Sequence, residues 1–160
     1  MPTVTQLTTD AEWDEAVPIL RQLWSHEDES FVRSWREEGE YELYGYYAVS
    51  DELSEGPGES DAVEEGTPGP NARLVAVAGL SIQRVLHHRR HAWIHDLVVD
   101  ESHRNRGHGA ELLAWIEDWA RDRDCQYVAL ACVAGNDEAL AFYEGEGLET
   151  WGRVVERELD

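Results

Sequence analysis

The 160-residue sequence contains no lysine, one methionine and only two cysteines, Cys125 and Cys132. Two cysteines are too few for a disulfide framework or a cysteine-based metal centre, so we expect no bound metal. No run of about 18 apolar residues occurs, so we expect no membrane-spanning helix and no membrane partner. The first residues, MPTVTQLTTD, have neither a basic start nor an apolar stretch, so we expect no signal peptide. These absences favour a cytoplasmic enzyme or binding module.

The chain is also poor in positive charge. It has 34 acidic residues against 13 basic ones, and its formal net charge is −21 at pH 7. Nucleic acids and anionic lipids are polyanions, so this excess of acid argues against general binding to either. Two interpretations of the acid stay open. It is either an adaptation to a salt-rich cytoplasm, in which a screened acidic surface stays soluble, or a feature that favours cationic partners such as polyamines.

The composition otherwise predicts a folded protein. Hydrophobic residues make up 42% of the chain, including seven Trp and six Tyr, which is enough to offset the entropy of ordering. The length is typical of a single domain, here residues 1–160. Residues 51–72 differ, since they hold seven acids, four Gly, three Pro and no base. We expect a flexible acidic loop there, either a tolerated insertion or a lid over an active site.

Hydrophobic periodicity predicts a mixed α/β order of elements. Strands are expected at residues 3–8, 41–49, 73–85, 91–99 and 126–133, with a final strand or hairpin at 148–159. Helices are expected after an N-cap at Asp10, at 29–38, at 109–124, and after an N-cap at Asn136. Residues 87–91 (HHRRH) form a predicted hairpin turn and the only basic patch. This patch is either a solvated turn or a tip that binds an anion or a partner.

A glycine-containing loop carries the first chemical signal. A predicted strand ends at Val99, a helix is predicted to begin at Gly109, and Arg104-Asn105-Arg106-Gly107-His108-Gly109-Ala110 spans the junction. The N–H groups at the start of a helix attract anions, and glycine lets a phosphate approach the backbone. The loop therefore predicts an anion-binding cradle. It is neither a Walker loop nor the dinucleotide fingerprint, because the Gly-Lys-Ser/Thr ending is absent and the glycine spacing differs.

A second pattern follows a predicted buried strand. It reads Asn136-x-x-Ala139-x-x-Phe142-Tyr143-x-x-x-Gly147-Leu148, and the interval between the two patterns fits one helix and one strand. Together the patterns resemble those of the GNAT (Gcn5-related N-acetyltransferase) superfamily over residues 93–148 and, by element order, over most of the chain. The resemblance implies an α/β (α+β) fold of the GNAT type. Its sheet is mixed and mostly antiparallel, with a central pair of parallel strands that splay apart, and helices flank it.

The resemblance also implies acetyl-CoA as the cosubstrate. Family members hold its pyrophosphate over the loop that matches Arg104, Asn105, Arg106, Gly107, His108, Gly109 and Ala110. They hold its pantetheine arm between two strands, here Leu97, Val98 and Val99 and the strand at 126–133. A backbone N–H near Leu97 to Val99 would stabilise charge on the acetyl carbonyl. The position that matches Asn136 often contacts the cofactor. The side chains of His103 and His108 are expected to be solvated.

Tyr143 matches the family tyrosine that often acts as general acid. In the reaction an amine attacks the thioester, and the leaving group is a thiolate. A phenol with a pKa of about 10 stays protonated at neutral pH and can donate a proton to that sulfur. The alternative is that Tyr143 is an aromatic core residue of the last helix.

The general base is expected on the strand at 91–99. Simple alternation puts Trp93, His95 and Leu97 on one face and Asp96 on the other, where Asp96 is expected to be structural. Some relatives use a glutamate on this strand, but the matching position here is Trp93. His95 is the candidate, because serotonin N-acetyltransferase has a histidine on the same strand and an imidazole with a pKa of about 6.5 is suited to accept a proton. The alternative is a structural histidine.

These features predict an N-acetyltransferase that moves acetyl from acetyl-CoA to a primary amine by direct attack in a ternary complex. The acceptor is a small amine, an amino acid or a protein N-terminus. In this family its pocket is built by the first two helices, here with residues 24–35, and Glu40 and Glu42 lie nearby in the sequence. The alternative is a non-catalytic acyl-CoA-binding or scaffold module on the same fold. A homodimer is one assembly that stays open.

Overall fold

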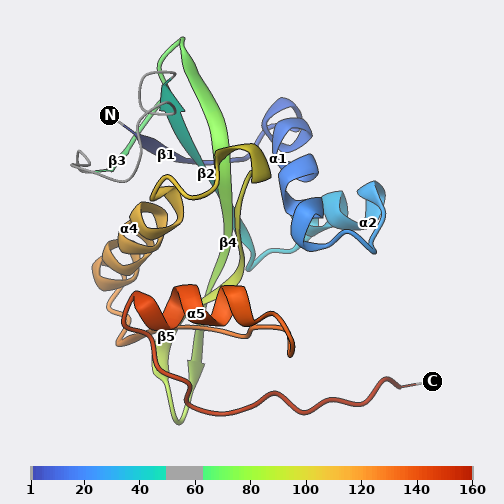
Figure 1. Ribbon diagram of the computed structural model, residues 1–160, viewed down its shortest axis with the longest axis vertical. Helices are drawn as coiled ribbons and strands as arrows, with labels where there is room; N and C mark the ends of the chain where they lie inside the picture. The colour runs from blue at the N-terminus through green and yellow to red at the C-terminus, as the bar shows by residue number, and fades with distance from the viewer. Residues whose placement is uncertain (1, 50–62, 160) are drawn as a thin grey trace. The chain divides into compact units, whose positions relative to one another are not determined.

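The computed structural model describes residues 2–49 and 63–159 (Figure 1). The chain divides into two compact units, residues 1–129 and 130–160, and each is described by itself. Most of the predicted acidic loop, residues 51–62, lies outside the described residues. Among the residues that are described, no helix is long and apolar enough to cross a membrane.

Within the described residues, the first unit is built on a six-stranded sheet of order β3-β1-β2-β4-β5-β6. Its strands are β1 Thr3–Gln6, β2 Glu42–Val49, β3 Glu64–Glu65, β4 Ala72–Val85, β5 Arg89–Val99 and β6 Tyr127–Leu130, the last of which ends in the second unit. The pairs β1–β2, β2–β4 and β4–β5 are antiparallel, and β1–β3 is parallel. β6 begins beside the start of β5, where the Gln126 N–H donates to Arg90 O at 2.8 Å. The predicted mixed, mostly antiparallel sheet is confirmed.

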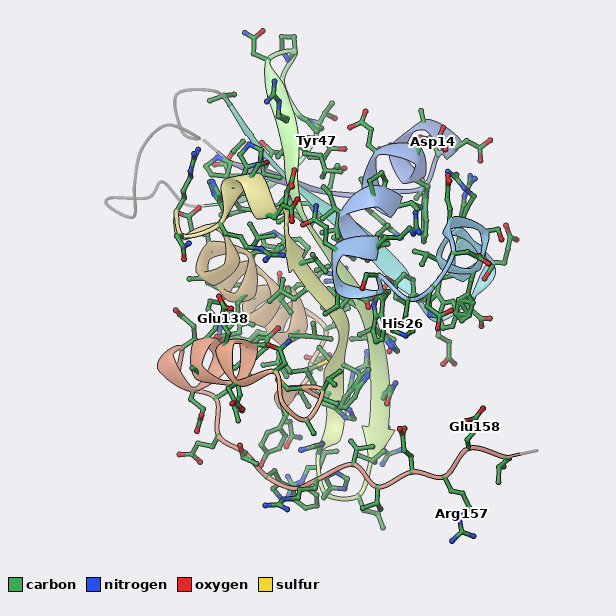
Figure 2. The ribbon with its side chains drawn as sticks, turned by 45° about the vertical axis from the view of Figure 1, so that its right-hand side comes forward. Asp14, His26, Tyr47, Glu138, Arg157 and Glu158 are labelled. Atoms are coloured by element: carbon green, nitrogen blue, oxygen red, sulfur yellow. The ribbon has the colours of Figure 1, made fainter. Side chains whose placement is uncertain are left out.

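Helix α1, Asp10–Leu23, is capped by Thr9 and not by the predicted Asp10. The Thr9 hydroxyl accepts from the Glu12 N–H at 3.2 Å, and the Glu12 carboxylate accepts from the Thr9 N–H at 2.9 Å. This reciprocal capping box satisfies two N–H groups at the start of the helix. Figure 2 labels Asp14, which lies within α1, and His26, which follows the helix.

Within the first unit, helices α1 and α4 lie on opposite faces of the sheet (Figure 1). On one face, Leu43 of β2 packs with Trp13 of α1 in a buried cluster. Tyr44 follows Leu43 in the strand and so points to the opposite face. There it accepts a hydrogen bond at 3.0 Å from Trp119 Nε1 of helix α4, His108–Asp122. The amphipathic helix predicted at 109–124 is therefore confirmed, with both ends shifted by one or two residues.

Several predicted boundaries are wrong in detail. The helix expected at 29–38 is split into α2, Glu29–Ser34, and a 3-10 helix η1, Trp35–Glu37. Residues 64 and 65, expected in a loop, form β3 and pair with Thr3 and Val4. The hairpin turn is shorter than 87–91, because β4 and β5 stay paired as far as Val85 and Arg89. A hairpin keeps its ladder where both strands can continue to pair backbone groups, and the basic residues at this tip do not prevent that.

The second unit holds helix α5, Asp137–Gly145, which begins at the predicted N-cap. Asn136 Oδ1 accepts from the Ala139 N–H at 3.2 Å. The final strand or hairpin expected at 148–159 is wrong, because those residues form neither helix nor strand. Residues 149–159 are exposed, and Figure 2 labels Arg157 and Glu158 among them. A strand needs a partner for its N–H and C=O groups and gains little from side chains that stay in water.

Candidate active site

Strand β5 carries one more residue than the stretch of β4 with which it pairs. Gly79 pairs with Asp96 and Leu80 pairs with Ile94, so His95 has no opposite residue in the ladder. Such a β-bulge bends the strand and breaks the simple alternation of its faces. Bulges are frequent next to active sites, where they redirect a side chain.

The bulge brings His95 and Asp96 to the same tyrosine. The ring centroids of His95 and Tyr41 are 5.4 Å apart, and the Tyr41 hydroxyl donates to Asp96 Oδ2 at 2.6 Å. The prediction that His95 and Asp96 lie on opposite faces is therefore wrong. The physical reason is the extra residue, since strict alternation assumes an uninterrupted ladder.

His95 lines a cavity of about 420 Å³. The cavity is lined by Trp35, Glu38, Gly39, Glu40, Tyr41, Ser81, Gln83 and His95. His95 Nε2 lies 2.8 Å from Ser81 Oγ, and Gln83 Nε2 donates to the same hydroxyl oxygen at 3.3 Å. Ser81 itself is buried. The imidazole is thus held at one nitrogen by a fixed hydroxyl at the edge of the cavity.

Burial sets the protonation of this group. It lowers the pKa of His95 below the usual value, and the nearby Asp96 carboxylate acts in the opposite direction. The His95 imidazole is therefore neutral at pH 7 and can accept a proton. The pKa of Tyr41 is raised well above its usual value, first by burial and then by Asp96. Tyr41 consequently keeps its proton and acts as a donor to Asp96.

A second cavity, of about 480 Å³, shares a wall with the first. Both are lined by Glu38, Gly39, Glu40 and Tyr41, and the second adds Gln6, Arg36, Glu42 and Ile82. The charge of Arg36 is compensated, because its guanidinium pairs with Asp10 and donates to Thr8 O at 2.7 Å. The carboxylates of Glu38 and Glu40 therefore make the shared rim negative, and Glu42 adds a third carboxylate to the second cavity.

The residues at 24–35 that were predicted for the acceptor pocket lie in different surroundings. Trp35 lines the first cavity. Asp28 instead caps α2, where it accepts from the Phe31 N–H at 2.8 Å. His26, labelled in Figure 2, lies 6.0 Å from Trp24 between ring centroids and is exposed.

The predicted anion cradle lies at the other end of β5. Asn105 and Gly107 have positive φ angles of 65° and 83°, and Gly107 is the N-cap of α4. The Glu111 N–H donates to Gly107 O at 3.1 Å and closes the first helical turn. The N–H groups of a first turn point out of the helix end. Arg104 is exposed, and its Nε donates to Val99 O at 3.0 Å.

Two histidines of this region are buried, which corrects the expectation that their side chains are solvated. His103 is 8% exposed and His108 is 4% exposed. His108 Nδ1 lies 3.1 Å from the Tyr46 hydroxyl, which also donates to the Glu111 carboxylate. His108 lies one turn before Leu112, on the face of α4 that packs against the sheet. Because the His108 side chain faces the core, the cofactor contact predicted for this residue is expected from its backbone N–H.

The end of β5 is braced by the last turn of α1. Gln22 Nε2 donates to Asp100 Oδ1 at 3.1 Å, and Gln22 Oε1 accepts from the Glu101 N–H at 2.8 Å. Glu101 opens the short 3-10 helix η2, Glu101–His103, that leads into the glycine loop. The amide of one α1 side chain therefore fixes the start of the predicted cofactor-binding segment.

The strand segment that is predicted to hold the cofactor comprises Leu97, Val98 and Val99, and it pairs with β4 on one side. The described pairs give it no partner on the other side. β6 begins beside Arg90 and is four residues long. A strand of this length reaches about 13 Å, which is less than the length of β5 beyond Arg90. The last residues of β5 therefore lie beyond the part of that strand that β6 covers.

The remaining predicted residues, Asn136 and Tyr143, belong to the second unit. Tyr143 is partly buried in α5 and packs against Phe142, with ring centroids 5.1 Å apart. The Asn136 side chain caps α5. Within residues 2–49 and 63–159, no group of three or more His, Cys, Asp or Glu side chains could hold a metal ion.

Ser81 and the contact between Tyr41 and Asp96 were not predicted from the sequence. One signal could have indicated them. Gly79 is an isolated glycine inside a strand, a pattern that often marks a bulge or the close approach of another group. A Cβ at Gly79 would lie 2.1 Å from the Tyr41 hydroxyl oxygen, so the glycine makes room for that tyrosine.

Comparisons with known proteins agree with this architecture. Residues 11–147 match the Acetyltransferase (GNAT) family. Over 139 residues the chain is 27% identical to "Uncharacterized N-acetyltransferase YhdJ" of Bacillus subtilis (strain 168), covering 86% of this chain and 84% of that protein.

Two solved structures are similar in fold. The structure of AAC(6')-Iy in complex with a bisubstrate analog, CoA-S-monomethyl-acetylneamine, superposes with a TM-score of 0.72 at 15% identity, over 100% of this chain and 99% of that chain. A transcriptional regulator from Bacillus halodurans C-125 superposes with a TM-score of 0.73 at 18% identity, over 99% and 100% of the two chains. At these identities the likeness shows the fold.

Proposed function

The chain belongs to the Acetyltransferase (GNAT) family, and from this premise we propose that it transfers the acetyl group of acetyl-CoA to a primary amine by direct attack in a ternary complex. The observation that carries the proposal is the course of β5. This strand bears His95 at a cavity rimmed by carboxylates and leads through Leu97–Val99 toward the glycine loop before α4. One strand thus joins a group suited to take a proton from an amine with a helix end suited to hold an anion.

His95 is the proposed general base. An aliphatic amine is mostly protonated at pH 7 and must lose a proton before it attacks. Because burial lowers the pKa of His95, its imidazole is neutral and offers a lone pair to that proton, directly or through a water molecule. Ser81 Oγ, 2.8 Å from Nε2, holds the ring in place.

The proposed cofactor residues fit a diphosphate. Gly107 has a φ of 83° and opens α4, so the backbone can approach an anion there. Arg104 and Arg106 add positive charge in a chain with a net charge of −21. The backbone of Leu97, Val98 and Val99 is proposed to pair with the pantetheine arm and to donate one N–H to the acetyl carbonyl. We also propose a contact from Asn136.

Tyr143 is the proposed general acid. Acetyl-CoA supplies a thioester, and a C–N bond to the amine forms while the C–S bond breaks. The electron pair leaves with the sulfur, and the Tyr143 hydroxyl protonates that sulfur. The proton that the ammonium group loses before the attack goes to His95, and the second proton, lost from the nitrogen once the C–N bond has formed, restores the Tyr143 hydroxyl directly or through water. The role of Tyr143 is supported by the family pattern in which it lies and by its partial burial in α5.

We propose that the acceptor is a small cationic amine. Glu38, Glu40 and Glu42 line the cavities that meet at Tyr41, and carboxylates there would attract an ammonium group. One structure of similar fold holds a bisubstrate analog that contains CoA and acetylneamine, so aminoglycosides belong among the amines to be tested. An amino acid and a protein N-terminus are the other candidates.

A panel of amines tests this function. The purified protein is incubated with acetyl-CoA and with polyamines, aminoglycosides, amino acids and N-terminal peptides, and the release of CoA thiol is measured. We expect release with at least one cationic amine above the rate without amine. Binding of CoA with no release for any amine would favour the alternative, a non-catalytic acyl-CoA-binding or scaffold module.

We further propose that the excess of acid is an adaptation to a salt-rich cytoplasm. Two observations support it. The chain has no lysine, and its acids are spread over the whole sequence rather than confined to the cavities. Such a surface repels itself at low ionic strength and is relieved by screening.

A further inference from the structure

Asp96 is a buried carboxylate with two donors. It is 8% exposed. Its Oδ2 accepts from the Tyr41 hydroxyl at 2.6 Å, and its Oδ1 accepts from Trp24 Nε1 at 2.5 Å. An ionised carboxylate only accepts hydrogen bonds, and both of these groups donate. Hydrogen bonds of this kind, to a charged group away from water, are the strong ones.

The two donors come from different parts of the fold. Trp24 is the C-cap residue of α1, and Tyr41 lies just before β2. Asp96 itself follows His95 in the bulge of β5. The Asp96 carboxylate therefore connects three parts of the fold. These are the end of α1, the residue before β2, and the bulge of β5 in which His95, the proposed base, has no partner in the ladder.

Tyr41 is locked by these contacts and by the space around it. A Cβ at Gly79 would lie 2.1 Å from its hydroxyl oxygen and 2.3 Å from its Cζ atom, so the ring fills the room that Gly79 leaves. The ring also lies 5.4 Å from the His95 ring, measured between centroids. The same residue lines both cavities. The position of Tyr41 therefore sets the shape of the wall that an acceptor would meet beside His95.

We propose that Asp96 is a positioning residue for the acceptor amine, acting through Tyr41. By holding the Tyr41 hydroxyl, Asp96 fixes the wall between the two cavities and the ring against which His95 packs. The inference rests on the proposed function, because it takes these cavities as the acceptor site. It goes beyond that function by giving Asp96, expected to be merely structural, a specific effect on acceptor binding and none on acetyl-CoA binding.

Asp96 also affects the charge on His95. Its carboxylate raises the pKa of His95 against the lowering caused by burial. The other titratable groups that face His95 are Tyr41, which keeps its proton, and Glu38 and Glu40 of the cavity lining, while Ser81 and Gln83 of β4 carry no charge. Removing the Asp96 charge while keeping its shape should therefore lower the pKa of His95 further.

The test compares Asp96→Asn and Tyr41→Phe with the wild type and with Asp118→Asn. Asp118 is a matched control, because its side chain is 75% exposed on α4 and pairs only at the surface with Arg121. Steady-state kinetics with an active amine give KM for the amine and for acetyl-CoA. Because each variant breaks a buried hydrogen bond to a charged group, we expect the amine KM to rise about 10-fold or more, with the acetyl-CoA KM unchanged within about twofold.

A second measurement does not depend on activity. The pKa of His95 is followed by NMR of the imidazole in the wild type and the three variants. We expect Asp96→Asn to lower it, and Asp118→Asn to leave it unchanged. Tyr41→Phe keeps the Asp96 charge and should therefore change it less than Asp96→Asn does.

The outcomes separate the two levels of the proposal. If the wild type acetylates no amine, the proposed function fails, and the NMR titration still tests the link between Asp96 and His95. If Asp96→Asn and Tyr41→Phe turn over normally with an unchanged amine KM, the positioning role is wrong. A parallel rise in both KM values would also contradict it, since that result indicates a general structural loss. If Asp96→Asn does not fold, Tyr41→Phe alone decides, because it removes a single hydroxyl.

Discussion

The chemistry proposed for His95 depends on its protonation. Burial lowers the pKa of this imidazole, and Asp96 opposes the shift only in part. The protonated form is inactive as a base, so kcat/KM for the amine should rise as the pH rises through the pKa of His95. Because that pKa is lowered, the acid limb should lie below the value of about 6.5 that is usual for histidine.

The variant His95→Ala should lose the acid limb of the pH–rate profile. Its kcat/KM for the amine should fall by about 100-fold or more, which is the usual contribution of a general base. The pH–rate profiles of the wild type and the variant provide the check. His87→Ala is a suitable control, since His87 lies at the hairpin tip outside the lining of both cavities. A limb that stays in place without His95 would assign the base elsewhere or to water.

Gly107 adopts a backbone conformation that L side chains rarely take. Its φ is 83°, and it opens α4 at the proposed diphosphate site. Gly107→Val would strain the turn and put a branched side chain where the anion should approach, so acetyl-CoA affinity should fall by about 10-fold or more. Calorimetric titration with CoA measures this. Gly152→Val is the control, because nothing lies within 4 Å of a Cβ there; normal CoA binding by Gly107→Val would refute the cradle.

The role of Tyr143 can be separated from packing. Tyr143→Phe keeps the ring that packs on Phe142 and removes the hydroxyl that is proposed to protonate the leaving sulfur. We expect kcat to fall by about 10-fold or more while the affinity for acetyl-CoA stays nearly constant. The matched control is Tyr127→Phe, because the Tyr127 side chain is 51% exposed. Unchanged turnover in Tyr143→Phe would remove this residue from the mechanism.

At the scale of elements, α1 braces β5 at two points. Trp24 holds Asp96 on the acceptor side, and Gln22 holds Asp100 and Glu101 before the glycine loop. The two contacts lie four or five residues apart along β5 and its continuation. They therefore give α1 separate control of the wall beside His95 and of the segment that leads to α4.

Gln22→Leu tests the second brace. It keeps the side-chain volume roughly constant and removes two hydrogen bonds, so the start of the loop should loosen and the KM for acetyl-CoA should rise about threefold or more. The amine KM should stay within about twofold of the wild-type value, which is the reverse of the pattern expected for Asp96→Asn. Gln126→Leu serves as the control at an exposed hydrogen bond. Equal changes in both KM values would show that Gln22 acts on general stability.

The elements were largely predictable because their patterns are local. Apolar positions at helical spacing identified α4, and an aromatic-rich run identified β2. The bulge at His95 was not predicted, because the isolated Gly79 is only a weak signal and the position of the extra residue depends on how Gly79 and Leu80 pair with β5. For the same reason Asp96 was assigned to the wrong face. The strand expected at 148–159 failed because periodicity alone cannot supply a pairing partner.

The buried histidines show the same limit at the site. His108 was expected in solvent because it follows a glycine in a polar loop. Helix α4 begins one residue earlier than predicted, and that shift turns His108 toward Tyr46 and the sheet. Element boundaries are the least certain part of any sequence-based prediction, and here one residue decides whether a side chain faces the cofactor site or the core.

For the whole molecule, the net charge of −21 gives a prediction about salt. Raising KCl from about 0.1 M to about 1 M shortens the screening length from about 10 Å to about 3 Å and should relieve self-repulsion among the acids. We expect the thermal midpoint and the activity to rise together over this range. A neutral osmolyte at matched osmolality is the control, since it does not screen charge. If the protein is fully stable and active in dilute buffer, the acidic residues are not an adaptation to salt. The other interpretation, that they attract cationic partners, would then be favoured.

We propose that β5 connects an amine-binding cavity at His95 with an acetyl-CoA site at the start of helix α4. Mass spectrometry of the amine after incubation of the protein with acetyl-CoA, with the released thiol measured in the same sample, tests this connection most directly. We expect a cationic amine to gain one acetyl group for each thiol released, and we expect Gly107→Val to abolish both products. Thiol release without an acetylated amine, or CoA binding with neither product across the amine panel, would contradict it.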